Sequence, residues 1–168
     1  MAFNCYDTLI GSASSDGQLL VHALNLEAPD ENQRTTRIFA DNQIRSPLIM
    51  TRFSFTKRHV LATCYQNGVI CIWDLQSHVQ QHKTGGAETG SLNALRFKFS
   101  AHDNVCTGIA FSPVNNLLLC SAGLDGKIFF FDIVEGKQVK KIEVGPPLAS
   151  ISFCADGHTI GVGTEQTG

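Results

Sequence analysis

Ser121, His102 and Asp125 are the residue types of a hydrolytic triad: a hydroxyl nucleophile, an imidazole general base and a carboxylate that orients the base. Such a triad is defined by geometry, so the sequence leaves a second interpretation open. In that interpretation Asp125 belongs to a tight turn and His102 holds the turn by a hydrogen bond. The sequence around Asp125 favours this structural role, and we expect no enzyme active site in the chain.

Two other segments contain residue types that bind phosphate or metal. Gly85–Ser91 is rich in glycine, but it lacks the lysine and the strand–loop–helix context of a phosphate-binding loop. His78 and His82 could chelate a metal from one helix face, yet no complete set of four ligands is visible, even with Asp41 or the cysteines added. The sequence therefore predicts solvated loop histidines, with no metal and no other cofactor.

The elements that must position these residues are short strands. Cys106–Asp132 consists of three apolar runs, CTGIAFS, LLLCSAG and KIFFFD, which the turns PVNN and LDGK separate. Asx-Gly between two apolar runs favours a tight hairpin, because Gly adopts positive φ freely and Asn or Asp does so at low cost. The segment is predicted to be three antiparallel strands ending in an aromatic-Asp pair.

The same unit recurs along the chain. Asx-Gly pairs stand at Asp16-Gly17, Asn67-Gly68 and Asp125-Gly126, and aromatic-Asp pairs at Trp73-Asp74 and Phe131-Asp132. Phe111 and Phe153 lie 42 positions apart, within the roughly 40–45 residues of a WD40 repeat. We therefore predict an all-β protein of the WD40 β-propeller type, with about three blades plus partial strands. The expected repeats are residues 3–40, 47–100, 101–145 and 146–168, with a long loop at 77–93.

Strands are expected wherever apolar residues follow this pattern: Leu9–Ala13, Leu19–Ala23, Met50–Phe55, Leu61–Cys64, Val69–Asp74, Cys106–Phe111, Leu117–Ser121, Ile128–Asp132 and Ser150–Phe153, with an edge strand near Thr35–Phe39. By the register of the repeats, the first repeat has lost most of its first strand and the last repeat lacks its third. Closure is what removes sheet edges from a propeller. We therefore expect this chain by itself to be marginally stable or self-associating.

In WD40 blades a turn Asp, a preceding Ser or Thr, a strand aromatic and a His before the first strand form a buried hydrogen-bonded set. We expected the Ser or Thr two residues before the Asp, which in the third repeat is Gly123. No repeat holds all four residues, and His22 takes the aromatic place in the first repeat. The predicted structural residues are Ser14, Asp16, Asn67, Trp73, His102, Asp125 and Phe131.

Composition limits the classes of partner. The formal net charge is −2 over 168 residues, which argues against nucleic acid or an anionic membrane surface as the main partner. No apolar run is long enough to span a bilayer, and no secretory signal is visible at the N-terminus. The 6 cysteines are widely spaced, which predicts reduced, buried thiols in an intracellular protein.

Exposed loops are the expected place for protein binding. Arg52, Lys57 and Arg58 form a small basic patch near one turn, and Ser77–Asn93 is a long polar loop. Such segments on a rigid scaffold commonly carry partner-binding residues. We take the three basic residues as candidate partner-binding residues and the long loop as a second candidate.

Several of these motifs together resemble one family. They are Thr107–Leu118 (TGIAFSPVNNLL), Gly123–Asp132, Pro147-Leu148, Phe153, Asp156-Gly157, Gly163, Asn67-Gly68 and Ile72–Asp74, with His22 in place of Trp. This set, spread from about Thr8 to Thr164, resembles the propeller of the neural-precursor-cell-expressed, developmentally down-regulated WD40 protein family. The loops around Glu27–Asn32 and Gln80–Ser91 depart from that family.

The resemblance implies a non-catalytic adaptor of the centrosome and spindle pole, in the cytoplasm and cytoskeleton, that recruits the γ-tubulin complex for microtubule nucleation. In that family a helical region beyond the propeller binds the complex, so contacts with centrosomal or γ-tubulin complex proteins are expected mainly through regions outside this chain. The alternative is an unrelated WD40 scaffold, such as a ubiquitin-ligase substrate receptor or a trafficking subunit.

Overall fold

The computed structural model describes residues 1–25, 27, 35–41, 44–77, 79–80 and 94–165, and of residues 35–41 only the backbone. The described residues form three antiparallel sheets of four strands and one of two strands, and within each sheet neighbours in sequence are neighbours in space. Helical backbone among the described residues is confined to Gln76, Ser77, Val79 and Gln80. The all-β propeller-type prediction is therefore confirmed.

Each sheet is one blade. The first blade consists of β1 Ala2–Phe3, β2 Leu9–Ala13, β3 Leu19–Leu24 and β4 Thr35–Asp41. The second consists of β5 Leu48–Phe53, β6 Val60–Tyr65, β7 Val69–Asp74 and β8 Leu95–Ser100. The third consists of β9 Cys106–Phe111, β10 Leu118–Gly123, β11 Lys127–Asp132 and β12 Lys137–Glu143. The two-stranded sheet is β13 Leu148–Phe153 with β14 Ile160–Thr164.

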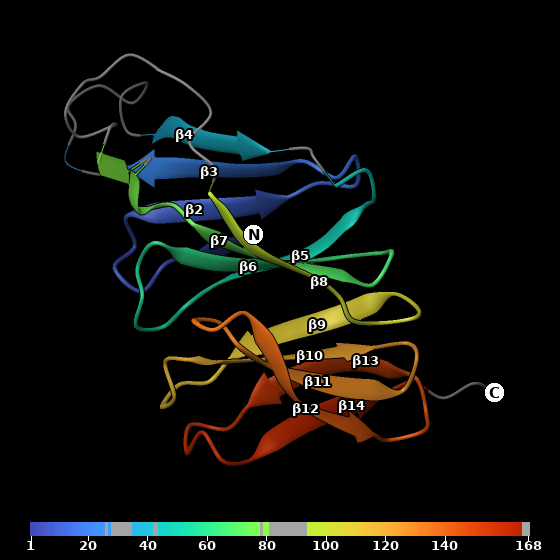
Figure 1. The fold of residues 1–168 in the computed structure, drawn as a ribbon. Helices are drawn as coiled ribbons and strands as arrows, with labels where there is room; N and C mark the ends of the chain where they lie inside the picture. Colours follow the sequence, from blue (N-terminus) through green and yellow to red (C-terminus); the bar gives the residue numbers. More distant parts are fainter. Residues whose placement is uncertain (26, 28–34, 42–43, 78, 81–93, 166–168) are drawn as a thin grey trace.

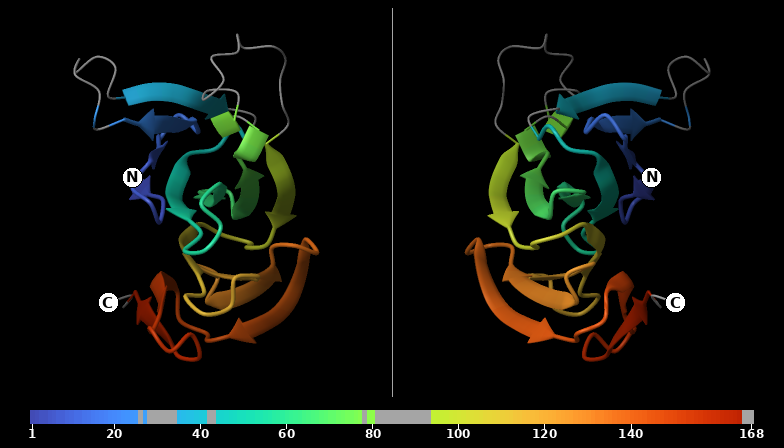
Figure 2. Two further views of the ribbon diagram at one scale, coloured as in Figure 1. Left: turned by 90° about the vertical axis from the view of Figure 1, so that its left-hand side faces the viewer. Right: turned by 90° about the vertical axis from the view of Figure 1, so that its right-hand side faces the viewer.

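The sheets lie side by side in chain order along an arc (Figures 1 and 2), and β5 contacts β9 while β9 contacts β13. The β1–β2, β5–β6, β9–β10 and β11–β12 turns lie at one end of the blades, on the left of Figure 1, which we call the β1–β2 end. The Asx-Gly turns lie at the opposite end, which we call the β2–β3 end. The left view of Figure 2 looks onto the β1–β2 end.

The hydrophobic core lies between blades, and strand alternation divides it. In β7, Cys71 and Trp73 belong to the cluster shared with the first blade, whereas Ile70 and Ile72 belong to the cluster shared with the third. Because the second blade is covered on both faces, nearly every residue of β6 and β7 is buried. This explains the uninterrupted apolar sequence of these strands, since alternating polar residues are needed only when one face meets water.

The strand register supports the equivalence of the repeats. The pairing of third and fourth strands shifts between Val21 and His22, between Ile72 and Trp73, and between Phe130 and Phe131. A bulge places two residues of one strand opposite one of its partner and re-aims the side chains that follow. His22 therefore occupies the same place as Trp73 in the blade, as its sequence position predicts.

The cysteines are free, and Cys64, Cys71, Cys106 and Cys120 are buried whereas Cys5 and Cys154 are exposed. The Cys64 thiol donates a weak hydrogen bond to the Cys106 carbonyl oxygen over 3.5 Å, across the boundary between the second and third blades. Burial raises the pKa of the Cys120 thiol to about 12, which keeps it neutral. The prediction of buried thiols therefore holds for Cys64, Cys71, Cys106 and Cys120, and it is wrong for Cys5 and Cys154, which lie at the surface.

Candidate interaction site

At the β2–β3 end each Asx residue closes its own turn. The Oδ1 atoms of Asp16, Asn67 and Asp125 accept hydrogen bonds from the backbone N–H two residues later, over 2.9 to 3.3 Å. The glycines that follow have φ of 87°, 78° and 70°, in the left-handed region. At Gly68 a side chain would also collide with the carbonyl oxygen of His102, so this turn packs directly on the connection into the third blade.

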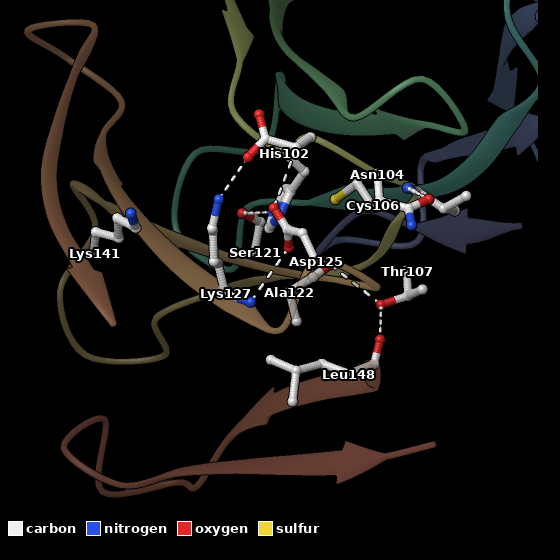
Figure 3. Close-up of polar contacts among 12 residues, drawn as sticks. His102, Asn104, Cys106, Thr107, Ser121, Ala122, Asp125, Lys127, Lys141 and Leu148 are labelled. Atoms are coloured by element: carbon white, nitrogen blue, oxygen red, sulfur yellow. Dashed lines mark hydrogen bonds and ion pairs between the residues drawn. The ribbon is translucent and has the colours of Figure 1, made fainter. Parts of the chain in front are cut away.

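In the third blade Ser121, His102 and Asp125 are hydrogen-bonded in series (Figure 3). His102 Nδ1 lies 2.9 Å from Asp125 Oδ1, and His102 Nε2 lies 2.8 Å from Ser121 Oγ. An ionised Asp125 accepts from Nδ1–H, which leaves Nε2 to accept the Ser121 hydroxyl proton. Burial lowers the pKa of His102 below 6.5, although the hydrogen bond and charge of Asp125 act in the opposite direction. The imidazole is therefore held neutral.

These contacts have the geometry of a hydrolytic triad, but their burial indicates a structural role. The side chain of His102 is 0% exposed and that of Asp125 is 6% exposed. Ser121 is also 0% exposed, so no substrate carbonyl can reach its hydroxyl in this structure. The set instead ties β10 and the β10–β11 turn to the loop before β9.

The structure corrects one residue of the predicted set. The hydroxyl comes from Ser121, four positions before Asp125, and not from the position of Gly123. A Cβ at residue 123 would lie 2.5 Å from His102 Nδ1 and 2.9 Å from Asp125 Oδ1, so a serine does not fit there. Strand alternation could not have separated the two positions, because Ser121 and Gly123 are two residues apart and share a face of the strand. Only the packing around His102 distinguishes them.

The second blade uses a different pair. The Trp73 indole N–H donates to Thr63 Oγ1 over 2.9 Å, and both side chains are buried. Thr63 stands four residues before Asn67, as Ser121 does before Asp125. The Ser46 hydroxyl accepts from Asn67 N–H over 3.1 Å and so joins the preceding loop to the turn. Phe131 cannot make the indole bond and packs on Phe99, with ring centroids 4.6 Å apart.

The first blade has the most exposed version. Asp16 lies at the surface, where a hydrogen bond from Ser14 and one from the Gln18 backbone lower the pKa of its carboxyl. His22 is half-buried at the aromatic place. This turn therefore has the same Asx geometry as the other two, but its hydrogen bonds are more exposed to water.

The candidate partner-binding residues separate into two places. Arg52 is exposed on β5, the inner strand of the second blade, and its guanidinium donates to the neighbouring Thr51 carbonyl oxygen over 3.3 Å. Lys57 and Arg58 lie in the β5–β6 turn and line a hollow of about 590 Å³ at the β1–β2 end. The hollow also contacts the first blade through Tyr6 and the third through Val134. Tyr6 and Val134 were not predicted, although apolar residues inside turns were a visible signal.

The candidate metal-binding histidines and phosphate-binding residues lie outside the part of the chain that the structure describes. His78, His82 and Gly85–Ser91 lie outside the described residues, as does most of Ser77–Asn93. No group of three or more His, Cys, Asp or Glu side chains within the described part of the chain could hold a metal ion. Among the same residues, no helix is long and apolar enough to cross a membrane.

Blades of this register, joined by Asx-Gly turns with buried hydroxyl partners, define a WD40 propeller-type protein-interaction domain. The family "WD domain, G-beta repeat" matches residues 93–132. A chain in a solved structure titled "Crystal Structure of Mitotic Checkpoint Complex" has a TM-score of 0.70 and 18% identity, over 92% of this chain and 41% of its own length. That likeness supports the fold.

Within the WD40 class the chain is NEDD1-like. It is 28% identical to "Protein NEDD1" of Homo sapiens over 166 residues, which are 99% of this chain and 22% of the human protein. It is 30% identical to "Protein NEDD1" of Mus musculus over 122 residues, which are 73% of this chain and 16% of the mouse protein. The chain thus spans about a fifth of the length of the curated relatives it matches.

Proposed function

We propose that this chain is the propeller portion of a non-catalytic adaptor of the centrosome and spindle pole, which recruits the γ-tubulin complex for microtubule nucleation. The observation that carries the proposal is the similarity to NEDD1, which extends over 99% of the chain. The burial of Ser121, His102 and Asp125 supports the non-catalytic part, because the residues best suited to hydrolysis hold a turn.

In this proposal the blades supply a rigid frame and the exposed loops supply contacts. Lys57 and Arg58 line the hollow on a turn that hydrogen bonds fix to the blades, whereas Arg52 lies on β5 and is not among the lining residues. Loops fixed on a rigid scaffold are the common carriers of binding. The propeller would thus contribute localisation, while γ-tubulin complex components would bind regions outside this chain.

The test is to deplete the full-length protein and image γ-tubulin at spindle poles, with the protein itself followed as a fluorescent fusion. We expect the fusion at the poles and a loss of γ-tubulin there, which re-expression of the full-length protein restores. Unchanged γ-tubulin after depletion would rule out the adaptor role. A generic WD40 scaffold, such as a ubiquitin-ligase substrate receptor or a trafficking subunit, would then be the better account.

A further inference from the structure

The β1–β2 end gathers exposed apolar side chains. Tyr6, Phe55 and Val134 are 64%, 59% and 47% exposed. Tyr6 and Val134 line the hollow, and Phe55 precedes the lining residue Thr56. Leu117, which is 39% exposed, is joined to the same region because its carbonyl oxygen accepts from Ile133 N–H over 2.8 Å. Exposed apolar side chains gathered in one region are a feature of interaction sites.

Part of the lining of the hollow is apolar and belongs to the core. Val60, Ile72 and Ile133 line it, and all three are buried members of the cluster between the second and third blades. The volume of about 590 Å³ lies in the roughly 300–1,000 Å³ range of small-ligand pockets, so the hollow has room for one large side chain. An inserted aromatic or leucine side chain would therefore meet apolar atoms below and Tyr6 and Val134 at the rim.

Local hydrogen bonds fix the walls of the hollow. Ser54 Oγ accepts from Thr56 N–H and Lys57 N–H over 3.4 and 3.2 Å. Asn4 Nδ2 donates to the Arg58 carbonyl oxygen over 3.3 Å, which joins the first and second blades. Asp132 Oδ1 accepts from Val134 N–H over 2.8 Å in the third. A surface ordered before binding loses less conformational entropy when a ligand arrives.

The carboxylates around the hollow are already engaged. Asp74 Oδ2 pairs with Arg96 Nη1 over 3.0 Å, and Glu135 pairs with Lys137. Asp132 accepts backbone N–H groups, which with a smaller contribution from nearby Lys57 lower the pKa of its carboxyl.

The cations facing the hollow are less committed. The Arg58 guanidinium has no ion pair with a described carboxylate, and its Nε donates to His59 Nε2 over 2.9 Å. Lys57 has no ion pair with a described carboxylate closer than 4.0 Å. The hollow therefore presents two cations that are not paired with a described carboxylate beside the apolar part of its lining, an arrangement complementary to a partner with carboxylates beside an apolar anchor.

We propose that the hollow at the β1–β2 end binds an acidic peptide segment of a partner protein, with one aromatic or leucine side chain in the cavity and flanking carboxylates on Lys57 and Arg58. The inference rests on the proposed role as a protein-interaction module and is independent of the centrosomal assignment. The net charge of −2 disfavours nucleic acid, which needs many cations.

The test uses the full chain and a fluorescein-labelled synthetic peptide with a central Trp-Leu pair and three glutamates on each side, followed by fluorescence anisotropy. We expect saturable binding that weakens when salt rises from roughly 0.1 to 1 M, since the Debye length falls from about 10 to about 3 Å. Arg58→Glu should raise the Kd about tenfold, because charge reversal turns attraction into repulsion. Arg45→Glu is the matched control, because Arg45 is an exposed cation outside the hollow, in the loop that packs on the Asp16-Gly17 turn, and it should leave the Kd nearly unchanged.

Peptide controls separate the two parts of the site. A peptide with alanines for Trp-Leu tests the cavity, and one with glutamines for the glutamates tests Lys57 and Arg58; both should bind more weakly. Circular dichroism of each variant checks that it is folded. Equal Kd values for Arg58→Glu and Arg45→Glu, tighter binding of a lysine-substituted peptide, or no binding to the folded protein would overturn the proposal. Loss of γ-tubulin on depletion with no peptide binding would refute this inference and leave the proposed function standing.

Discussion

Removing the Asp125 carboxylate tests the structural role of the buried Ser-His-Asp set. In Asp125→Ala, His102 Nδ1 loses its partner at 2.9 Å, and the backbone N–H groups of Asp103 and Lys127 lose theirs at 3.2 and 3.3 Å. An unpaired buried donor costs about 1–3 kcal/mol. The two N–H groups lie closer to water and add less, so we expect unfolding free energy to fall by about 2–3 kcal/mol.

Urea denaturation followed by circular dichroism measures this loss. With a slope of about 1–3 kcal/mol per M for a small domain, the midpoint should fall by roughly 1 M. Asp16→Ala is the matched control, because it removes the same turn acceptor at the surface of the first blade and should shift the midpoint much less. Asp125→Asn keeps an acceptor for Nδ1–H and should fall between the two. If Asp125→Ala and Asp16→Ala had the same midpoint, the buried hydrogen bonds would not stabilise the blade as argued.

Three further changes probe the same framework. Burial lowers the pKa of His102 below 6.5, so the stability that its neutral form contributes is complete above that pH and is lost as the pH falls. The urea midpoint should therefore drop between about pH 7.5 and about pH 5.5, and more steeply in the wild type than in His102→Gln. Thr63→Val removes the Oγ1 acceptor of the buried Trp73 N–H and should cost about 1–3 kcal/mol. A double-mutant cycle with Trp73→Phe should give a coupling above about 0.5 kcal/mol, and additive effects would contradict the bond. Gly123→Ala places a Cβ against His102 and should lower the melting temperature. Gly161→Ala is the control and should not, because a Cβ there would have no atom within 4 Å. Equal melting temperatures would show that the residues around position 123 relax to make room for the Cβ.

Strands were predicted correctly where a turn motif in the sequence stands at the point where pairing in the folded sheet ends. The expected bounds of β2, β7 and β9 match the structure, because an Asx-Gly turn or a polar loop marks where each apolar run stops. β8 was not among the expected strands, although Leu95–Ser100 alternates between half-buried and exposed residues. β8 forms a strand because it pairs with β7, and the long polar loop before β8 contains no turn motif that would have marked where the strand begins.

The sequence by itself determined the class of protein. Asp16-Gly17, Asn67-Gly68 and Asp125-Gly126 impose hairpins through backbone conformations that few other residue pairs adopt, and the 42-residue spacing repeats the unit. These are local properties, so they need no knowledge of neighbouring blades.

Tertiary structure alone decided which side chains act together. The choice of Ser121 over position 123 depends on the space His102 occupies after crossing from the preceding blade. The hollow likewise joins Tyr6, Arg58 and Val134 from three blades, far apart in the sequence. The repeat spacing in the sequence determines the strands and turns of each blade. The distances between blades depend on how their buried faces pack, and no local sequence pattern encodes that packing.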